Sequence, residues 1–180
     1  MIYTYKECIE KFGTDYEIRK CLAANQLKRV GRGIYSDEMY ESDLVIISKA
    51  YPYAVFTMTS AFYYHGLTDT IPEAYYLMTD KNSTKIKDER VCQFFDNYNS
   101  LTIGVENKEY NSATLRIFNR ERMLIELIRN KNRLPFDYYK EIISSYRKLI
   151  YELDIQAVQE YATLLPKTRL VLETLQLEVF

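Results

Sequence analysis

Two helix-start signatures lie close together at the beginning of this chain, and they constrain its fold more than any other feature. "TYKE" at 4–7 and "TDYE" at 14–17 both match the capping box, in which a Thr hydroxyl accepts the amide proton three residues on and the Glu reaches back to the cap amide. Gly13 and then Asn25 follow them, and these residue types readily end a helix in the left-handed conformation. Two short helices joined by a single tight turn are therefore predicted.

The segment after these helices, "LKRVGRGIY" at 27–35, is typical of a β-hairpin. Apolar and polar residues alternate around a turn that contains glycine. We expect Leu27 and Val30 to face one way, with Lys28 and Arg29 in solvent. Helix, turn, helix and hairpin follow one another as in a winged helix-turn-helix, whose second helix enters the DNA major groove while the hairpin tip follows the phosphates or the neighbouring minor groove.

Basic residues gather in this region although the whole chain has a formal net charge of -1. Residues 18–36 hold five basic side chains and no acidic one, and residues 1–35 carry seven basic and four acidic residues against 17 and 21 in the remainder. We expect a basic head and an acidic body, since Lys and Arg on a wing bind phosphate by releasing counterions. Basic helix-hairpin units also bind proteins, so a role in protein interaction alone stays open.

Beyond residue 50 the pattern predicts an α+β body over residues 51–180. A helix at 43–51 is expected to lead into this body. Strands are expected at "AVFT" and "AYYLMT", and between these two strands a helix capped by Thr59 or Ser60 and ended by Gly66. Three further runs, "CQFFDN", "LTIGVEN" and "ATLRIF", are expected to add antiparallel strands. The fold class predicted is thus an N-terminal winged helix-turn-helix over 1–50, followed by a small mixed sheet packed with C-terminal helices, the first of them capped by Asn119.

Composition and motifs argue against several classes of function. No apolar run approaches the ~18 residues that cross a bilayer, and the start lacks the layout of a signal peptide, so we expect a cytoplasmic protein without a membrane partner. Three cysteines form no CxxC and His65 is the single histidine, so neither a metal site nor a cofactor is predicted. The "GRG" at 31–33 lacks the lysine and helix of a phosphate-binding loop.

No catalytic residue is predicted either. Ser60 and His65 are the only candidate Ser/His pair, but five residues apart on one helix they point in different directions. His65 is instead expected to cap carbonyls at the helix end and to pack under Gly66. Of the 18 tyrosines, those at 63, 64, 75 and 76 suit either core packing or a protein-docking face.

Four segments together resemble the AbiEi family of abortive-infection antitoxins, the antitoxin half of type IV toxin-antitoxin systems. They are "LKRVGRGIY", "AVFTMTSAFYYHGL", "IPEAYYLMT" and "LRIFNRERMLIELIRN", and the resemblance extends over residues 4 to about 165. It implies a winged helix that represses its own promoter and a C-terminal part that counters a cognate nucleotidyltransferase-type toxin. The implied contacts to double-stranded DNA are Tyr16, Arg19, Lys20, Lys28, Arg29 and Arg32.

The resemblance leaves the toxin-opposing surface open, and we expect it on the basic helix from Asn119 to Arg133 and on the helices after it. The chain departs from the family at its start, where a further helix normally precedes the one at Thr4. We expect the head to rest on the 43–51 helix instead. Two alternatives remain beside the antitoxin, which are a solitary transcriptional regulator without a toxin and a winged-helix protein that acts only through protein interaction.

Overall fold

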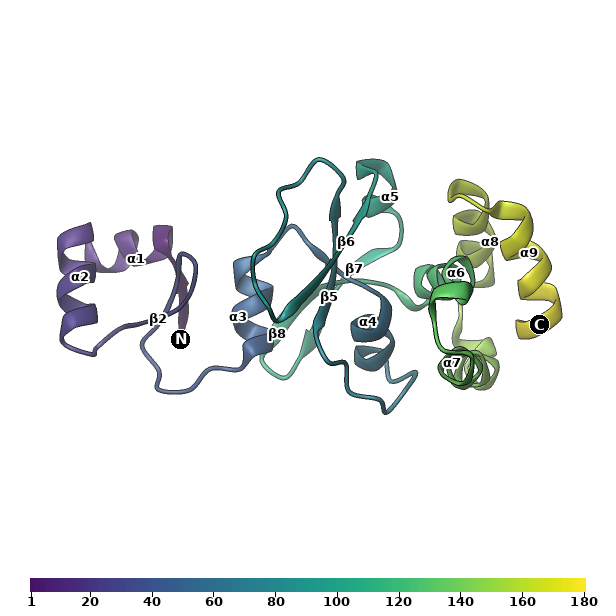
Figure 1. Ribbon diagram of the computed structural model, residues 1–180, viewed down its shortest axis with the longest axis horizontal. Helices are drawn as coiled ribbons and strands as arrows, with labels where there is room; N and C mark the ends of the chain where they lie inside the picture. The colour runs from purple at the N-terminus through teal and green to yellow at the C-terminus, as the bar shows by residue number, and fades with distance from the viewer. The chain divides into compact units, whose positions relative to one another are not determined.

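The computed structural model describes residues 1–180, and they divide into two compact units. One consists of Met1–Tyr53 with Glu109–Leu115, and the other of Ala54–Lys108 with Arg116–Phe180. Helices and strands are mixed in both, so the α+β class is confirmed (Figure 1). No helix combines the length and the apolar character needed to span a membrane.

Within Met1–Tyr53, the N-terminal unit contains three strands and three helices. In chain order these are β1 (Ile2–Thr4), α1 (Tyr5–Phe12), α2 (Asp15–Ala23), β2 (Lys28–Gly31), β3 (Ile34–Ser36) and α3 (Asp43–Ala50). The strands pair antiparallel in the order β1-β3-β2. The strand β1 was not predicted, because three residues carry too little alternation to be recognised in sequence.

The two helix starts lie where their caps predict. Thr4 forms the complete capping box, in which its hydroxyl accepts from the Glu7 amide at 3.3 Å and its own amide donates to the Glu7 carboxylate at 2.6 Å. Thr14 forms half of a box, since it accepts from the Glu17 amide while that carboxylate pairs with Lys20. A residue with a positive φ follows each helix, Gly13 after the first and Asn25 after the second.

Helices pack on both faces of the small sheet. On one face α1 and α2 pack over a cluster of Tyr3, Cys8, Ile18, Leu27 and Tyr35. On the other, α3 packs over Ile2 and Ile34, and Val30 belongs to this side. The prediction that Leu27 and Val30 face one way is therefore wrong, because Leu27 lies before β2 begins and packs under α1 and α2, whereas Val30 lies within β2 on the side of α3. The support expected from the 43–51 helix is confirmed.

The rest of the chain contains a larger sheet and most of the helices. Its elements are β4 (Val55–Phe56), α4 (Met58–Tyr64), β5 (Tyr75–Asp80), β6 (Val91–Asp96), α5 (Tyr98–Thr102), β7 (Val105–Tyr110), β8 (Ala113–Phe118), α6 (Arg120–Arg129), α7 (Phe136–Lys148), α8 (Ile155–Leu164) and α9 (Thr168–Thr174). Short 3-10 turns, η1 (Lys131–Arg133) and η2 (Ile150–Glu152), flank α7, and a π-helical turn, η3 (Leu175–Val179), follows α9.

The five-stranded sheet is mixed, in the order β6-β5-β4-β8-β7. β4 and β5 pair antiparallel as expected, and β7 lies beside β8, to which a two-residue turn joins it; β5 and β6 are parallel, and so are β4 and β8. The expectation of added antiparallel strands is wrong for β6, because the polar loop at 81–90 carries the chain back before β6 begins. The predicted strand at "LTIGVEN" is also half wrong, since 98–102 forms α5 and β7 starts only after left-handed Gly104.

The N-cap of helix α4 lies two or three residues before its expected caps. Its N-cap is Thr57, whose side chain makes no capping bond, so the prediction of Thr59 or Ser60 as the cap is wrong. The Ser60 hydroxyl is engaged with the edge of β5, where it donates to the Ala74 carbonyl at 3.2 Å and accepts from the Tyr76 amide at 2.9 Å. Left-handed Gly66 follows the helix as predicted.

Helix α6 lies at the centre of the C-terminal unit, with α4, α8 and α9 packed around it (Figure 1). Every side chain from Arg122 to Ile128 is buried. Asn119 caps it as predicted, accepting from the Arg122 amide at 2.9 Å. Tyr64 belongs to this unit's core and packs edge-on against Phe56, which supports core packing for that tyrosine.

Candidate nucleic-acid interface

The β2–β3 hairpin presents three positive charges to solvent. Lys28 and Arg29 are exposed on β2, and Arg32 is exposed at the turn beside left-handed Gly33. None of the three forms an ion pair, and only Arg29 makes a side-chain hydrogen bond, from Nε to the Gly31 carbonyl at 3.3 Å. We call these three residues the basic wing. Their charges remain available to an anionic partner.

Helix α2 turns one face to the core and the opposite face to solvent. Ile18 is buried, whereas Tyr16, Arg19 and Lys20 are exposed, Tyr16 with 73% of its surface accessible to solvent. Both cations are paired along the helix, Arg19 with Asp15 at 2.8 Å and Lys20 with Glu17 at 3.7 Å. Exposed pairs of this kind contribute only about 0.3–0.5 kcal/mol, so a phosphate can displace the carboxylate.

The wing and α2 are anchored to one core. Ile18 of α2 and Leu27, the residue before β2, belong to the same buried cluster as Tyr35 of β3. All six side chains implied as DNA contacts are therefore exposed on one unit. The structure separates them into an unpaired set on the wing and an exposed set on α2 whose two cations are paired.

Acidic residues immediately follow the wing, at Asp37, Glu38, Glu41 and Asp43. Asp37 accepts from the Met1 amine, from the Tyr3 hydroxyl and from Lys11, and these bonds, the amine's first, hold its pKa well below its usual value. With these acids the N-terminal unit contains eight basic and nine acidic residues, and the other unit sixteen of each. The expected contrast between a basic head and an acidic body is thus wrong; the charge is polarised within the N-terminal unit.

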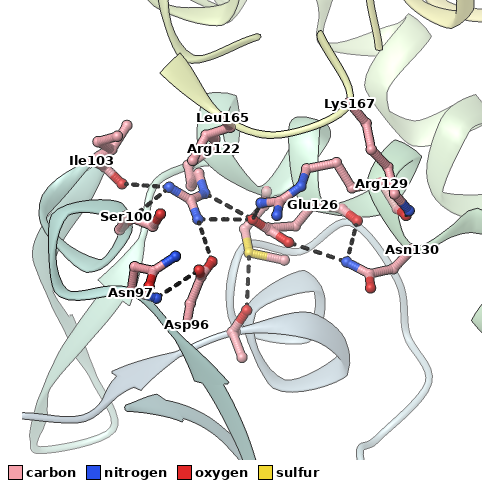
Figure 2. A network of polar contacts seen from close by, with 12 residues as sticks. Asp96, Asn97, Ser100, Ile103, Arg122, Glu126, Arg129, Asn130, Leu165 and Lys167 are labelled. Atoms are coloured by element: carbon pink, nitrogen blue, oxygen red, sulfur yellow. Dashed lines mark hydrogen bonds and ion pairs between the residues drawn. The ribbon is translucent and has the colours of Figure 1, made fainter. Parts of the chain in front are cut away.

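The basic helix expected to oppose a toxin is mostly inaccessible. Arg122 is fully buried over the Phe118 ring, and it donates from Nε to Glu126 at 3.0 Å and from Nη1 to the Ser100 carbonyl at 2.8 Å. Figure 2 shows Glu126 also accepting from Arg129 at 2.6 Å and from Asn130 at 3.1 Å. Burial lowers the pKa of Arg122. Residues 122–128 therefore cannot form the toxin-opposing surface expected from Asn119 to Arg133.

The buried ion pair was missed in the sequence, although a signal for it was present. Arg122 and Glu126 are four residues apart within "RERMLIELI", a run whose other central residues are apolar. Charged residues are rarely buried unless paired. At helical spacing inside an apolar run, an Arg and a Glu can satisfy that condition with each other.

His65 and Ser60 both have structural partners. His65 is 4% exposed, and its Nε2 lies 2.7 Å from the carbonyl oxygen of Phe118, the last residue of β8. Burial lowers the pKa of His65 to about 4. The expected carbonyl cap is thus present, but the carbonyl belongs to β8 and not to the end of α4. Ser60 is bonded to the β5 backbone.

The three cysteines are free thiols, and no group of three His, Cys, Asp or Glu side chains is placed to hold a metal ion. Comparison of the chain with protein-family models and with curated proteins finds no match. The observations that bear on function are therefore the geometry and charge of the chain itself.

Proposed function

We propose that the N-terminal unit is a winged helix-turn-helix that binds double-stranded DNA, and that the chain regulates transcription from its own promoter. The observation that carries this proposal is the unpaired basic wing of Lys28, Arg29 and Arg32 on a hairpin that follows two short helices. The element order β1-α1-α2-β2-β3 and the sheet order β1-β3-β2 support it, because a wing needs that scaffold to reach DNA beside the second helix.

In this proposal α2 enters the major groove with its N-terminal turns toward the bases. Tyr16 stands in the first turn of α2, exposed and without a hydrogen bond, where a base edge or a sugar can contact it. Arg19 and Lys20 exchange their carboxylate partners for phosphates. The wing follows the backbone beside the groove and supplies affinity that does not depend on sequence.

We also propose, from the resemblance to AbiEi antitoxins, that the chain opposes a nucleotidyltransferase-type toxin in the cytoplasm. Because α6 is buried from Arg122 to Ile128, we look for the opposing surface on the exposed faces of α7 and α8. Co-expression with the product of a neighbouring nucleotidyltransferase-like reading frame tests this part. Restored growth is expected; persistent toxicity would leave a regulator without an antitoxin role.

The DNA-binding proposal is tested by fluorescence anisotropy on the DNA upstream of the gene, over a series of salt concentrations. Each lost phosphate contact lowers the slope of log affinity against log salt by about 0.9. Arg29→Ala with Arg32→Ala should lower the slope by about two and weaken binding to all sequences. Lys6→Ala is the matched control, an exposed cation of α1 that already pairs with Glu10, and should leave the slope unchanged.

No binding to that DNA at low salt would contradict the proposal and favour a role in protein interaction alone. An equal loss of DNA affinity in the wing variant and in the Lys6→Ala control would contradict the proposal that the basic wing contacts phosphate. Circular dichroism of each variant separates a lost contact from a lost fold.

A further inference from the structure

We propose that the C-terminal unit contains a binding site for a small aromatic zwitterion, the chemical class of the aromatic α-amino acids. The site is a cavity of about 360 Å³. Its wall comes from the start of α4, the segment 70–73, strands β5 and β6, the connection from α6 to α7, and the start of α7. Cavities of roughly 300–1,000 Å³ with a largely apolar wall and few polar groups are the usual form of small-molecule sites.

Aromatic rings form one part of the wall. Tyr76 of β5 and Phe94 of β6 stack with their centroids 6.0 Å apart and an interplanar angle of 28°. Tyr138 of α7 adds a third ring. All three are half-buried, so part of each ring remains accessible. A flat apolar ring is the group that such a wall accommodates best, by stacking or by edge contacts.

Two opposite charges line the same cavity without a partner. Glu73 and Arg133 are both exposed, and neither makes an ion pair or a side-chain hydrogen bond, with each other or with any other residue. The two neighbouring cations differ in this respect, since Arg129 at the end of α6 pairs with Glu126 and Lys131 pairs with Glu178. Arg133 is therefore the cation of this segment whose planar guanidinium group is available to bind a carboxylate.

The pair of charges decides which ligand fits. An aromatic anion would satisfy Arg133 but would be repelled by Glu73, and an aromatic cation would leave Arg133 without a partner. A zwitterion places its carboxylate at Arg133 and its ammonium at Glu73. Asn130 also lines the cavity, and its amide nitrogen donates to the Glu126 carbonyl at 2.9 Å, so its side-chain oxygen is fixed and can accept from the same ammonium.

The test is isothermal titration calorimetry of the full chain with three probes of matched ring. L-phenylalanine carries both charges, phenethylamine lacks the carboxylate, and 3-phenylpropionate lacks the ammonium. We expect L-phenylalanine to bind, and each truncated probe to bind about tenfold more weakly or worse, since a charge-assisted hydrogen bond is lost. No binding of L-phenylalanine, or equal affinity for either truncated probe, would overturn the proposal.

Substitutions at the two exposed charged residues test which ligand group each residue binds. Arg133→Gln should weaken the binding of L-phenylalanine about tenfold or more without weakening that of phenethylamine. Glu73→Gln should weaken the binding of L-phenylalanine to the same extent without weakening that of 3-phenylpropionate, whose repulsion by Glu73 it removes. Lys148→Gln, an exposed cation on α7 outside the cavity wall, is the control and should change nothing. If Arg133→Gln and Lys148→Gln behave alike, or if adenosine monophosphate binds more tightly than L-phenylalanine, the assignment is wrong.

Discussion

The Nε2 atom of His65 lies 2.7 Å from the backbone carbonyl oxygen of Phe118, so one buried imidazole joins the C-cap of α4 to the last residue of β8. The ring is neutral, with Nε2 donating, because the side chain is buried and burying a charged imidazole without a counter-charge is costly. Arg120 adds a second link from α6, donating to the His65 carbonyl at 3.4 Å. Helix α4 is thus attached to the end of the strand that leads into the central helix.

This relationship predicts a loss of stability in mild acid. The pKa of His65 is lowered to about 4 in the folded protein, against the ordinary 6.5 in the unfolded chain. The unfolded state therefore binds more protons between these values, and the free energy of unfolding should decrease by about 3 kcal/mol as the pH falls from 6.5 to 4. Urea unfolding at intervals across this range measures it.

His65→Gln is the matched variant for this prediction, because its amide can still donate to the Phe118 carbonyl but cannot titrate. Its stability should be nearly flat from pH 6.5 to 5, a range in which ordinary carboxylates stay ionised in both states. His65 is the only histidine, so no other side chain of ordinary pKa can mask the effect. If wild type and variant lose stability in parallel over that range, the neutral buried imidazole is not the cause.

The local parts of the fold could be predicted because their causes are local. Thr4 and Thr14 cap helices through hydrogen bonds to residues three positions on. Gly13 ends the first helix because glycine adopts a positive φ without steric strain. Strand pairing depends on residues far apart in sequence. Phe56 of β4 pairs parallel with Ile117, and no pattern around either residue states that direction.

Gly104 should tolerate no side chain. A Cβ there would lie 2.6 Å from the Cβ of Arg122 and 2.8 Å from Oδ1 of Asn119, and the residue is also left-handed, at φ +67. Gly104→Ala should therefore cost several kcal/mol, more than the ~1–2 kcal/mol of a left-handed alanine alone. Gly66→Ala is the control, with φ +70 and nothing within 4 Å of the added atom. Thermal unfolding of both variants checks the difference, and equal costs would contradict the steric argument.

The buried pair of Arg122 and Glu126 should be costly to break from one side. Arg122→Met removes the bonds to Ser100 and Glu126 and leaves the carboxylate buried, which typically costs about 3–5 kcal/mol. Arg129→Met removes a partner of the same carboxylate, but its side chain is 14% exposed and Arg122 remains in place. We therefore expect Arg129→Met to lower the free energy of unfolding by less than Arg122→Met does. Urea unfolding of both variants measures the difference, and a larger loss for Arg129→Met would reverse the assigned roles.

The candidate interface was predictable in its residues but not in its electrostatics. A helical period places Tyr16 and Lys20 nearly opposite Ile18 and Arg19 about a quarter turn away from it, so their exposure follows from the sequence. Their pairing with Asp15 and Glu17 depends on which rotamers the helix surface favours, and that cannot be read from spacing alone. The cavity beside Glu73 and Arg133 brings together residues from six segments, and no sequence pattern indicated it.

The difference between the wing and α2 yields a final prediction for DNA binding. Arg32 has no partner, so Arg32→Gln should weaken binding and lower the salt slope by about one. Asp15→Asn should strengthen binding a few-fold at low salt, because it frees Arg19 and removes a negative charge near phosphate. Glu10→Gln is the control for that gain, since it frees Lys6 in the same way on α1 instead of α2. Anisotropy at two salt concentrations measures all three, and an equal gain from Glu10→Gln would mean that net charge and not the position of α2 governs affinity.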